Sequence, residues 1–176
     1  MNLLFVITSV VRLKNEENSV FTPEERFNQT VHTILTIKQK NPLAQIVVLE
    51  ASFGDKTLVV FNNVFMYYID HTGDDDDLNE AKMLPTFVAS SCYKNLTRGT
   101  EYMVCNLSGR YYLDDDFDIG KFDQHKINLS PGILNTFYTF PSRKKVFLTD
   151  ISNGLLNNIS LMGISGFRNS GEFVKY

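Results

Sequence analysis

The chain has 176 residues, of which 43% are hydrophobic and 12% aromatic. These values are typical of a globular domain, and we expect residues 1–176 to form a single domain with a buried core. The formal net charge of −3 argues against a nucleic-acid partner, because such proteins usually carry a concentrated basic face. The two cysteines, Cys92 and Cys105, have neither zinc-site nor C-x-x-C spacing, which fits a reducing, cytoplasmic setting.

The first predicted element is a strand from Leu3 to Val11, a continuous apolar run rich in β-branched residues. Such runs are typical of strands that are buried on both faces. The run lacks the basic region and the cleavage site of a signal peptide, and it is too short to span a bilayer. We therefore expect a core strand here and no membrane span.

A helix follows, and its beginning and end are both marked in the sequence. Thr22 can cap the helix, Pro23 suits its first position, and Glu25 completes a capping box. The helix is expected to end near Lys40, because Asn41-Pro42 stops it. A second buried strand is predicted from Gln45 to Ser52. Strand, helix and strand form a βαβ unit, which predicts a right-handed crossover and a parallel sheet.

The remaining elements continue the α/β pattern. The predicted strands are 64–69, the central strand 102–107, 135–140, 145–149 and two short ones around a turn within 164–176; the predicted helices are 78–93 and a short one at 155–162. The sequence therefore predicts one α/β domain with an open, mostly parallel sheet flanked by helices.

Several common active-site motifs are absent. The chain contains no P-loop, no G-x-S-x-G elbow and no G-x-G-x-x-G after its first strand, where Thr8-Ser-Val-Val-Arg12 stands instead. His32, His71 and His125 are scattered without metal-ligand spacing. A dinucleotide-binding domain and a serine hydrolase are not expected.

Polar residues stand where three predicted strands end. Because parallel strands end at one edge of a sheet, and ligands bind there in open α/β folds, we expect these residues to lie together. Arg110 can pair with phosphate oxygens in a bidentate way, and Glu50 can accept hydrogen bonds from a ribose or base. Strand ends are polar in many proteins, which is the simpler interpretation. The residues are Thr8, Ser9, Glu50, Ser52, Ser108, Gly109 and Arg110.

An acidic cluster, Asp114-Asp115-Asp116, follows the central strand after a few residues. Carboxylates at alternate positions, here Asp114 and Asp116, can hold Mg²⁺ or Mn²⁺ on a diphosphate. A solvated turn or a helix cap is the alternative. The second acidic run, Asp74 to Asp77, is expected to be a solvated turn that leads into a helix.

Short motifs along the chain resemble those of glycosyltransferase-like proteins encoded by large viruses, phages and some bacteria. The resemblance extends from the first strand to the C-terminal segment and is weak in the middle of the chain. The matching motifs are 5–9, 19–30, 46–52, Leu107-Ser-Gly-Arg-Tyr-Tyr-Leu113 with the acidic residues and Phe117, 164–166 and 170–173.

The resemblance implies a Rossmann-like, nucleotide-diphospho-sugar transferase fold of the GT-A type and a reaction that moves a sugar from a nucleotide donor to a glycan or other acceptor. In that family an Asp-x-Asp motif usually holds a metal at the central strand end, whereas Ser108-Gly109-Arg110 stands there in this chain. Either Arg110 replaces the cation, or Asp114 and Asp116 fold back to hold Mn²⁺ or Mg²⁺. The expected catalytic residues are Arg110 and Asp116, the latter as a metal ligand or as a base. The expected nucleotide pocket consists of Thr8, Ser9, Glu50, Ser52, Ser108 and Gly109.

Two further functions fit the same sequence. One is a sugar-nucleotide or glycan-binding module without catalysis, which the missing Asp-x-Asp favours. The other is a structural protein of a virus that shares only the α/β core. A viral protein of either kind would act in the cytoplasm of the host.

Overall fold

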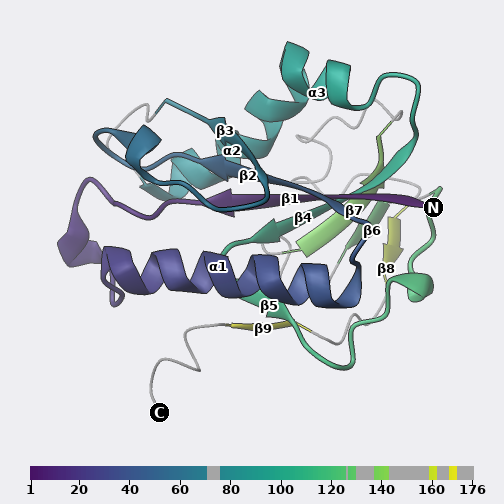
Figure 1. Cartoon of the computed structure of the whole chain (residues 1–176), viewed down its shortest axis with the longest axis horizontal. Coiled ribbons are helices and arrows are strands. Elements are labelled where there is room, and N and C mark those ends of the chain that lie inside the picture. Colours follow the sequence, from purple (N-terminus) through teal and green to yellow (C-terminus); the bar gives the residue numbers. More distant parts are fainter. Residues whose placement is uncertain (71–75, 126, 130–136, 143–158, 162–166, 170–176) are drawn as a thin grey trace.

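The computed structural model describes residues 1–70, 76–125, 127–129, 137–142, 159–161 and 167–169. A mixed, mostly parallel sheet has the strand order β3-β2-β1-β4-β7-β6-β8 (Figure 1). Strand β1 pairs in parallel with β2 and β4, and β2 with β3, whereas β7 is antiparallel to β4 and β6. The predicted α/β architecture, a mostly parallel sheet flanked by helices, is confirmed. The strands are β1 (Asn2–Ser9), β2 (Gln45–Glu50), β3 (Phe65–Tyr68), β4 (Tyr102–Ser108), β6 (Ile127–Leu129), β7 (Phe137–Pro141) and β8 (Ile159–Leu161).

Helix α1 (Pro23–Lys40) connects β1 to β2, as the capping signals predict. The N–H of Glu25 donates to Thr22 Oγ1 at 3.2 Å, and the N–H of Thr22 donates to Glu25 Oε2 at 2.7 Å. This reciprocal pair satisfies two N–H groups that a helix start otherwise leaves without partners. At the other end the Asn41 N–H still reaches the carbonyl of Ile37 at 2.7 Å.

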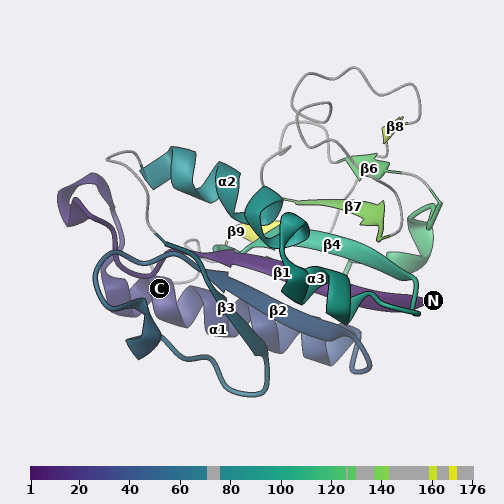
Figure 2. The same cartoon turned by 90° about the horizontal axis from the view of Figure 1, so that it is seen from above.

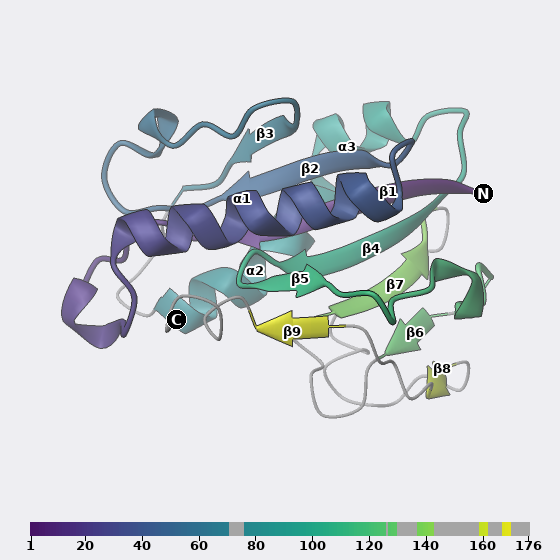
Figure 3. The same ribbon diagram turned by 60° about the horizontal axis from the view of Figure 1, so that its bottom comes forward.

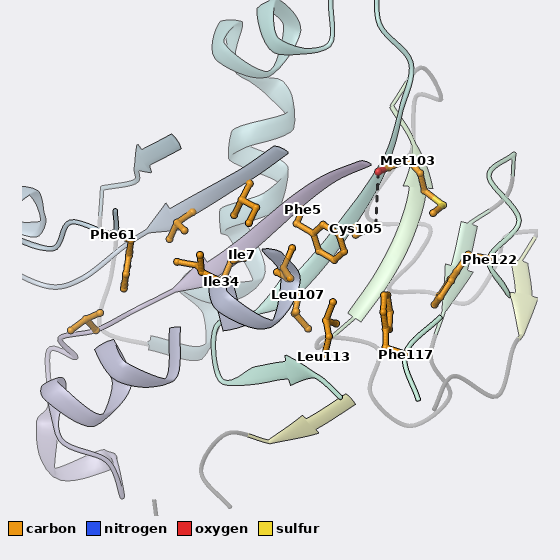
Figure 4. Packing of buried hydrophobic residues seen from close by; sticks show 14 of the residues in the cluster. Phe5, Ile7, Ile34, Phe61, Met103, Cys105, Leu107, Leu113, Phe117 and Phe122 are labelled. Atoms are coloured by element: carbon orange, nitrogen blue, oxygen red, sulfur yellow. Dashed lines mark hydrogen bonds between the residues drawn. The ribbon is translucent and has the colours of Figure 1, made fainter. Parts of the chain in front are cut away.

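The core has two halves, one on each face of the sheet. Figures 1 and 2 show α1 on one face and α2 (Asp76–Ala89) with α3 (Ser91–Leu96) on the other. Side chains alternate between faces along a strand, so Phe5 packs on the α1 side while Leu4 and Val6 pack on the α2 side. Figure 4 shows the α1-side cluster, in which Phe5 and Ile7 meet side chains of α1 and β4. Burial on both faces explains the unbroken apolar runs in the sequence.

The helix predicted over residues 78–93 is wrong in one respect, because it is two helices. Helix α2 ends at Ala89, and Ser90 caps α3 by accepting a hydrogen bond from the Tyr93 N–H at 3.1 Å. The Ser90 hydroxyl also donates to the Phe87 carbonyl at 2.6 Å. A serine that bonds to the backbone on both sides competes with helix continuation, which accounts for the break.

The C-terminal half departs further from the sequence prediction. Ile159–Leu161 is a strand parallel to β6, so the short helix predicted over residues 155–162 is wrong there. Phe167–Asn169 is a strand, as predicted, but it pairs with Tyr111–Leu113. These two strands, β9 and β5, form a separate two-stranded sheet. The strand predicted at residues 145–149 and the turn and second strand after Asn169 lie outside the described residues.

Candidate functional site

Strands β1, β2 and β4 end at the same edge of the sheet. In the register of the parallel pairs, Ser9 is the partner of Glu50, and Thr8 is the partner of Ser108. All four side chains are buried, with at most 5% of their surface exposed. The strand ends whose polar residues the sequence singles out are therefore neighbours in space. We refer to this side of the sheet as the carboxyl edge.

The two faces of the sheet divide these side chains. Alternation along the strands puts Ser9 and Glu50 on the α1 side with Phe5, whereas Thr8 and Ser108 share the α2 side. A single ligand on either face would therefore meet only part of the predicted set. Side chains from the two faces can contact the same ligand only beyond the ends of the strands.

A small depression lies at that point, where β1 and β4 end. Hydroxyl groups and two arginines line it, and no carboxylate is among its described lining residues. Its free volume is about 10 Å³, room for one water-sized group such as a single phosphate oxygen, and its hydroxyl and guanidinium groups are donors that suit such an oxygen. The lining residues are Thr8, Ser9, Val10, Arg26, Thr30, Ser108, Gly109 and Arg110.

Gly109 lets the turn after β4 lie directly against α1. A Cβ at this position would stand 2.6 Å from Thr30 Oγ1 and 3.1 Å from the carbonyl oxygen of Thr8. The Gly109 N–H donates to that same Thr8 carbonyl at 2.8 Å. The hydroxyl of Thr33, one turn along α1, lies within hydrogen-bonding distance of the carbonyls of Gly109 and Tyr111. The Thr33 hydroxyl has one proton, so it can donate to one of these carbonyls at a time, and the Gln29 carbonyl of the helix, 3.1 Å away, is a third acceptor. Figure 3 shows β5, which follows this turn, alongside α1.

Glu50 is fully buried, and its carboxylate joins two loops. Its Oε1 accepts hydrogen bonds from the Ser52 N–H at 2.9 Å, from the Ser52 hydroxyl and from the Val11 N–H at 3.4 Å. The Ser52 hydroxyl in turn accepts from the Arg12 N–H at 2.9 Å. Glu50 and Ser52 therefore hold the loop after β1 against the loop after β2, and they lie inside the protein rather than on a ligand surface.

Burial raises the pKa of the Glu50 carboxyl above its ordinary value of 4.5, and hydrogen bonds from Ser52 oppose this rise. The Ser9 hydroxyl on the neighbouring strand also lowers this pKa, while Glu50 Oε2 has no hydrogen-bond partner among the described residues. A buried carboxylate oxygen without a partner makes the ionised form costly.

The acidic cluster forms a turn. The Asp116 N–H donates to Asp114 Oδ1 at 3.0 Å, and the Phe117 N–H donates to the Asp114 carbonyl at 3.3 Å. Asp115 pairs with Lys40, the last residue of α1, at 3.2 Å. Among the described residues, no group of three or more His, Cys, Asp or Glu side chains is placed to hold a metal ion.

The structure does not bring this turn to Arg110. Strand β5 runs along α1 away from the carboxyl edge, and the Leu113 N–H donates to Thr36 Oγ1 at 3.2 Å. Lys40 lies ten residues after Thr30 in the helix, and a rise of 1.5 Å per residue makes this about 15 Å. Because Asp115 is beside Lys40 and Gly109 is beside Thr30, Asp114 and Asp116 lie toward the opposite edge of the sheet.

Sequence reasoning missed Arg26, Thr30 and Thr33 of α1. Their spacing of four and three residues places them on one side of the helix, next to the apolar stripe. That polar row is the signal that the sequence offers. The sequence does not indicate that this row contacts the turn at Gly109, which is far along the chain.

A second, larger hollow lies at the carboxyl edge where β2 and β3 end, beside α2. Its lining combines the ring of Tyr67, which packs against Phe87 on the α2 side, with one cation, Lys82, and one carboxylate, Asp70. It is lined by Ala51, Tyr67, Tyr68, Ile69, Asp70, Lys82 and Thr86.

Comparisons with known proteins do not assign a function to this site, because neither a family model nor a curated protein matches the chain. No helix in the described part of the chain is long and apolar enough to cross a membrane.

Proposed function

We propose that this protein is a small glycosyltransferase that moves a sugar from a nucleoside-diphosphate donor to an acceptor. The observation that carries the proposal is the depression at the ends of β1 and β4, which is lined by hydroxyls and by Arg110. Its position at the carboxyl edge of parallel strands is where open α/β folds bind ligands. The sequence resemblance to glycosyltransferase-like proteins points to a sugar nucleotide as that ligand.

In this proposal Arg110 binds the diphosphate. Negative charge grows on the diphosphate as the bond between sugar and phosphate breaks, and a fixed guanidinium stabilises that charge. The Thr33 hydroxyl, which can donate to the carbonyl before or after Arg110, helps to hold the turn in place before the ligand arrives. The nucleoside occupies the second hollow, where Tyr67 offers an aromatic ring on the α2 side of the sheet.

Other residues that the sequence placed in the site have different roles in this proposal. Glu50 and Ser52 shape the pocket indirectly, because their polar atoms bond to the loops after β1 and β2. A metal at Asp114 and Asp116, and a base at Asp116, are not part of the proposal, because these carboxylates are beside the C-terminal end of α1.

A sugar-nucleotide-binding module without catalysis is the second candidate. The observation that favours it is the lining of the depression, which includes no carboxylate among the described residues. An inverting transfer needs a base for the acceptor hydroxyl, and a carboxylate or histidine usually provides it.

Turnover of sugar nucleotides by the Arg110→Ala variant tests the proposal. We expect the variant to remain folded and to lose most activity. The matched control is Arg98→Ala, which removes an equal charge from an exposed residue that follows α3. Undiminished turnover in Arg110→Ala would contradict the role of Arg110. Binding of a sugar nucleotide by the wild-type protein without any turnover would favour the binding module.

A further inference from the structure

The second hollow at the carboxyl edge lies between the sheet and α2. Its free volume of about 290 Å³ is at the lower end of the range for small-molecule sites, whereas the depression at the ends of β1 and β4 has room for one oxygen. Ala51, Tyr67 and Ile69 line the hollow from the α2 side of the sheet. Lys82 and Thr86, one turn apart, line it from the helix. The hollow can therefore hold a whole ligand group.

Lys82 brings a positive charge to this hollow. Its side chain is exposed, and no carboxylate in the described part of the chain forms an ion pair with it. The sequence supplies no partner one turn away on α2, because residues 78, 79, 85 and 86 are uncharged. The Thr86 hydroxyl donates to the Lys82 carbonyl at 2.8 Å and leaves the ammonium group to a ligand.

The carboxylate in the lining of the hollow, Asp70, is already paired. Lys56 Nζ donates to Asp70 Oδ1, and this bond lowers the pKa of the Asp70 carboxyl below its ordinary value. Asp70 is therefore ionised near neutral pH, and the charge of Lys56 balances its own. Lys56, Lys82 and Asp70 are two cations and one carboxylate, so the hollow has an excess of one positive charge.

Tyr67 brings an aromatic ring to the same hollow. Its ring packs edge-on against that of Phe87, with the centroids 5.0 Å apart, and Phe87 is fully buried in the core. This contact holds the ring on the α2 side of the sheet, and nucleobases stack on such rings. A ring from β3 and a cation from α2 suit a ligand that has both a planar ring and an anionic group.

We propose that the second hollow binds a nucleotide, with Tyr67 beside the base and Lys82 in contact with the phosphate that is attached to the ribose. The inference deepens the proposed function and rests on it for the identity of the planar group as a nucleobase. The strand order β3-β2-β1-β4 places the hollow and the depression next to each other along the carboxyl edge. Lys82 thus binds the inner phosphate, and Arg110 contacts an oxygen of the outer one.

Titration calorimetry with the common ribonucleoside 5′-monophosphates and the matching nucleosides, at low and fixed ionic strength, tests the inference. The variants are Lys82→Gln, which removes the charge, and Lys82→Arg, which keeps it. Lys94→Gln is the matched control, because it removes an equal charge from an exposed residue of α3. Urea unfolding without ligand shows whether each variant keeps the native fold.

We expect the wild type to bind one of the monophosphates, and to bind it more tightly than its nucleoside. Lys82→Gln weakens monophosphate binding by about tenfold or more, the range for a hydrogen bond to a charged group, and leaves nucleoside binding unchanged. Lys82→Arg keeps most of the affinity, and Lys94→Gln binds as the wild type does. Wild-type monophosphate affinity in a folded Lys82→Gln protein would overturn the inference, and so would a wild-type protein that binds no monophosphate more tightly than its nucleoside.

Sugar-nucleotide turnover separates this inference from the proposed function. Monophosphate binding that depends on Lys82, in a protein that turns over no sugar nucleotide, would support the inference and contradict the transferase. Turnover with an unchanged KM for the sugar nucleotide in Lys82→Gln would support the transferase and contradict the role of Lys82.

Discussion

The Thr33 hydroxyl lies 3.0 Å from the carbonyl oxygen of Gly109, the residue immediately before Arg110. It also reaches the carbonyl of Tyr111, the residue immediately after. The hydroxyl has a single proton and can donate to one of these two carbonyls at a time, so one side chain of α1 anchors the turn that carries Arg110. The helix and the turn after β4 therefore act as one unit at the carboxyl edge.

Replacing Thr33 with valine removes the hydroxyl at nearly constant volume. We expect this to destabilise the fold by about 1–2 kcal/mol, because buried carbonyls lose a donor. Thr33→Ser keeps the hydroxyl and is expected to lose less. Urea unfolding measures both. A loss in Thr33→Ser without a loss in Thr33→Val would show that packing of the methyl group, and not the hydrogen bond, is what Thr33 contributes.

Gly109→Ala places a methyl group against Thr30 and the Thr8 carbonyl. Overpacking of this kind typically costs about 1–3 kcal/mol. Thr30→Ala removes the nearest obstructing atom, so the double variant is expected to lose less than the sum of the single losses. The Thr8 carbonyl at 3.1 Å remains, and recovery is therefore partial. Additive losses would mean that Thr30 does not set the space at Gly109.

The buried Glu50 carboxyl gives a prediction about pH. Because its folded-state pKa is raised, the folded protein binds this proton more tightly than the unfolded chain does. The resulting stability is fully present below the ordinary pKa of 4.5 and is lost as the pH rises through the folded pKa.

Glu50→Gln lacks this titration. The stability of the wild type relative to Glu50→Gln is therefore expected to fall with rising pH, by no more than about 1.4 kcal/mol per pH unit. Urea unfolding of both proteins from about pH 4, just below the ordinary carboxyl pKa, to about pH 8 measures the difference. A difference that rises with pH would show that the folded state favours the ionised carboxyl.

The position of the acidic turn gives a prediction about metals. Asp114→Asn and Asp116→Asn are expected to leave nucleotide binding unchanged, with or without Mn²⁺. Both residues lie beside the C-terminal end of α1, whereas the turn that carries Arg110 contacts α1 near Thr30. In Asp114→Asn the new amide oxygen can still accept the hydrogen bond that closes the turn, so the fold is kept. Thermal shifts with nucleoside diphosphates measure the effect, and a Mn²⁺-dependent shift that either variant abolishes would contradict the placement.

Local signals in the sequence predict the N-terminal half well. The capping box of Thr22 and Glu25 marks the start of α1, and apolar runs mark β1, β2 and β4, because these features depend on neighbours along the chain. The meeting of Thr8, Ser9, Glu50 and Ser108 at one edge follows from parallel strands. The strand–helix–strand pattern predicts this parallel pairing, although the contacts themselves join residues far apart in the sequence.

Distant contacts decide what sequence reasoning missed. The direction of β5 depends on Thr36 and on its pairing with β9, and it carries Asp114 and Asp116 away from Arg110. Arg26 reads as an ordinary surface residue of a helix, although it bonds to the Val10 carbonyl. Ile159–Leu161 has helix-compatible spacing, but pairing with β6 makes it a strand.

The most direct test of the proposed function is thermal unfolding of the wild-type protein with nucleoside diphosphates and their sugar conjugates. A ligand at about 100 times its Kd stabilises the native state by roughly 2.7 kcal/mol, which raises the Tm of a domain of this size by several degrees. We predict such a shift for one nucleotide class, without a requirement for Mn²⁺, and its loss in Arg110→Ala. The absence of a shift with every compound would contradict the assignment of a sugar nucleotide to the carboxyl edge.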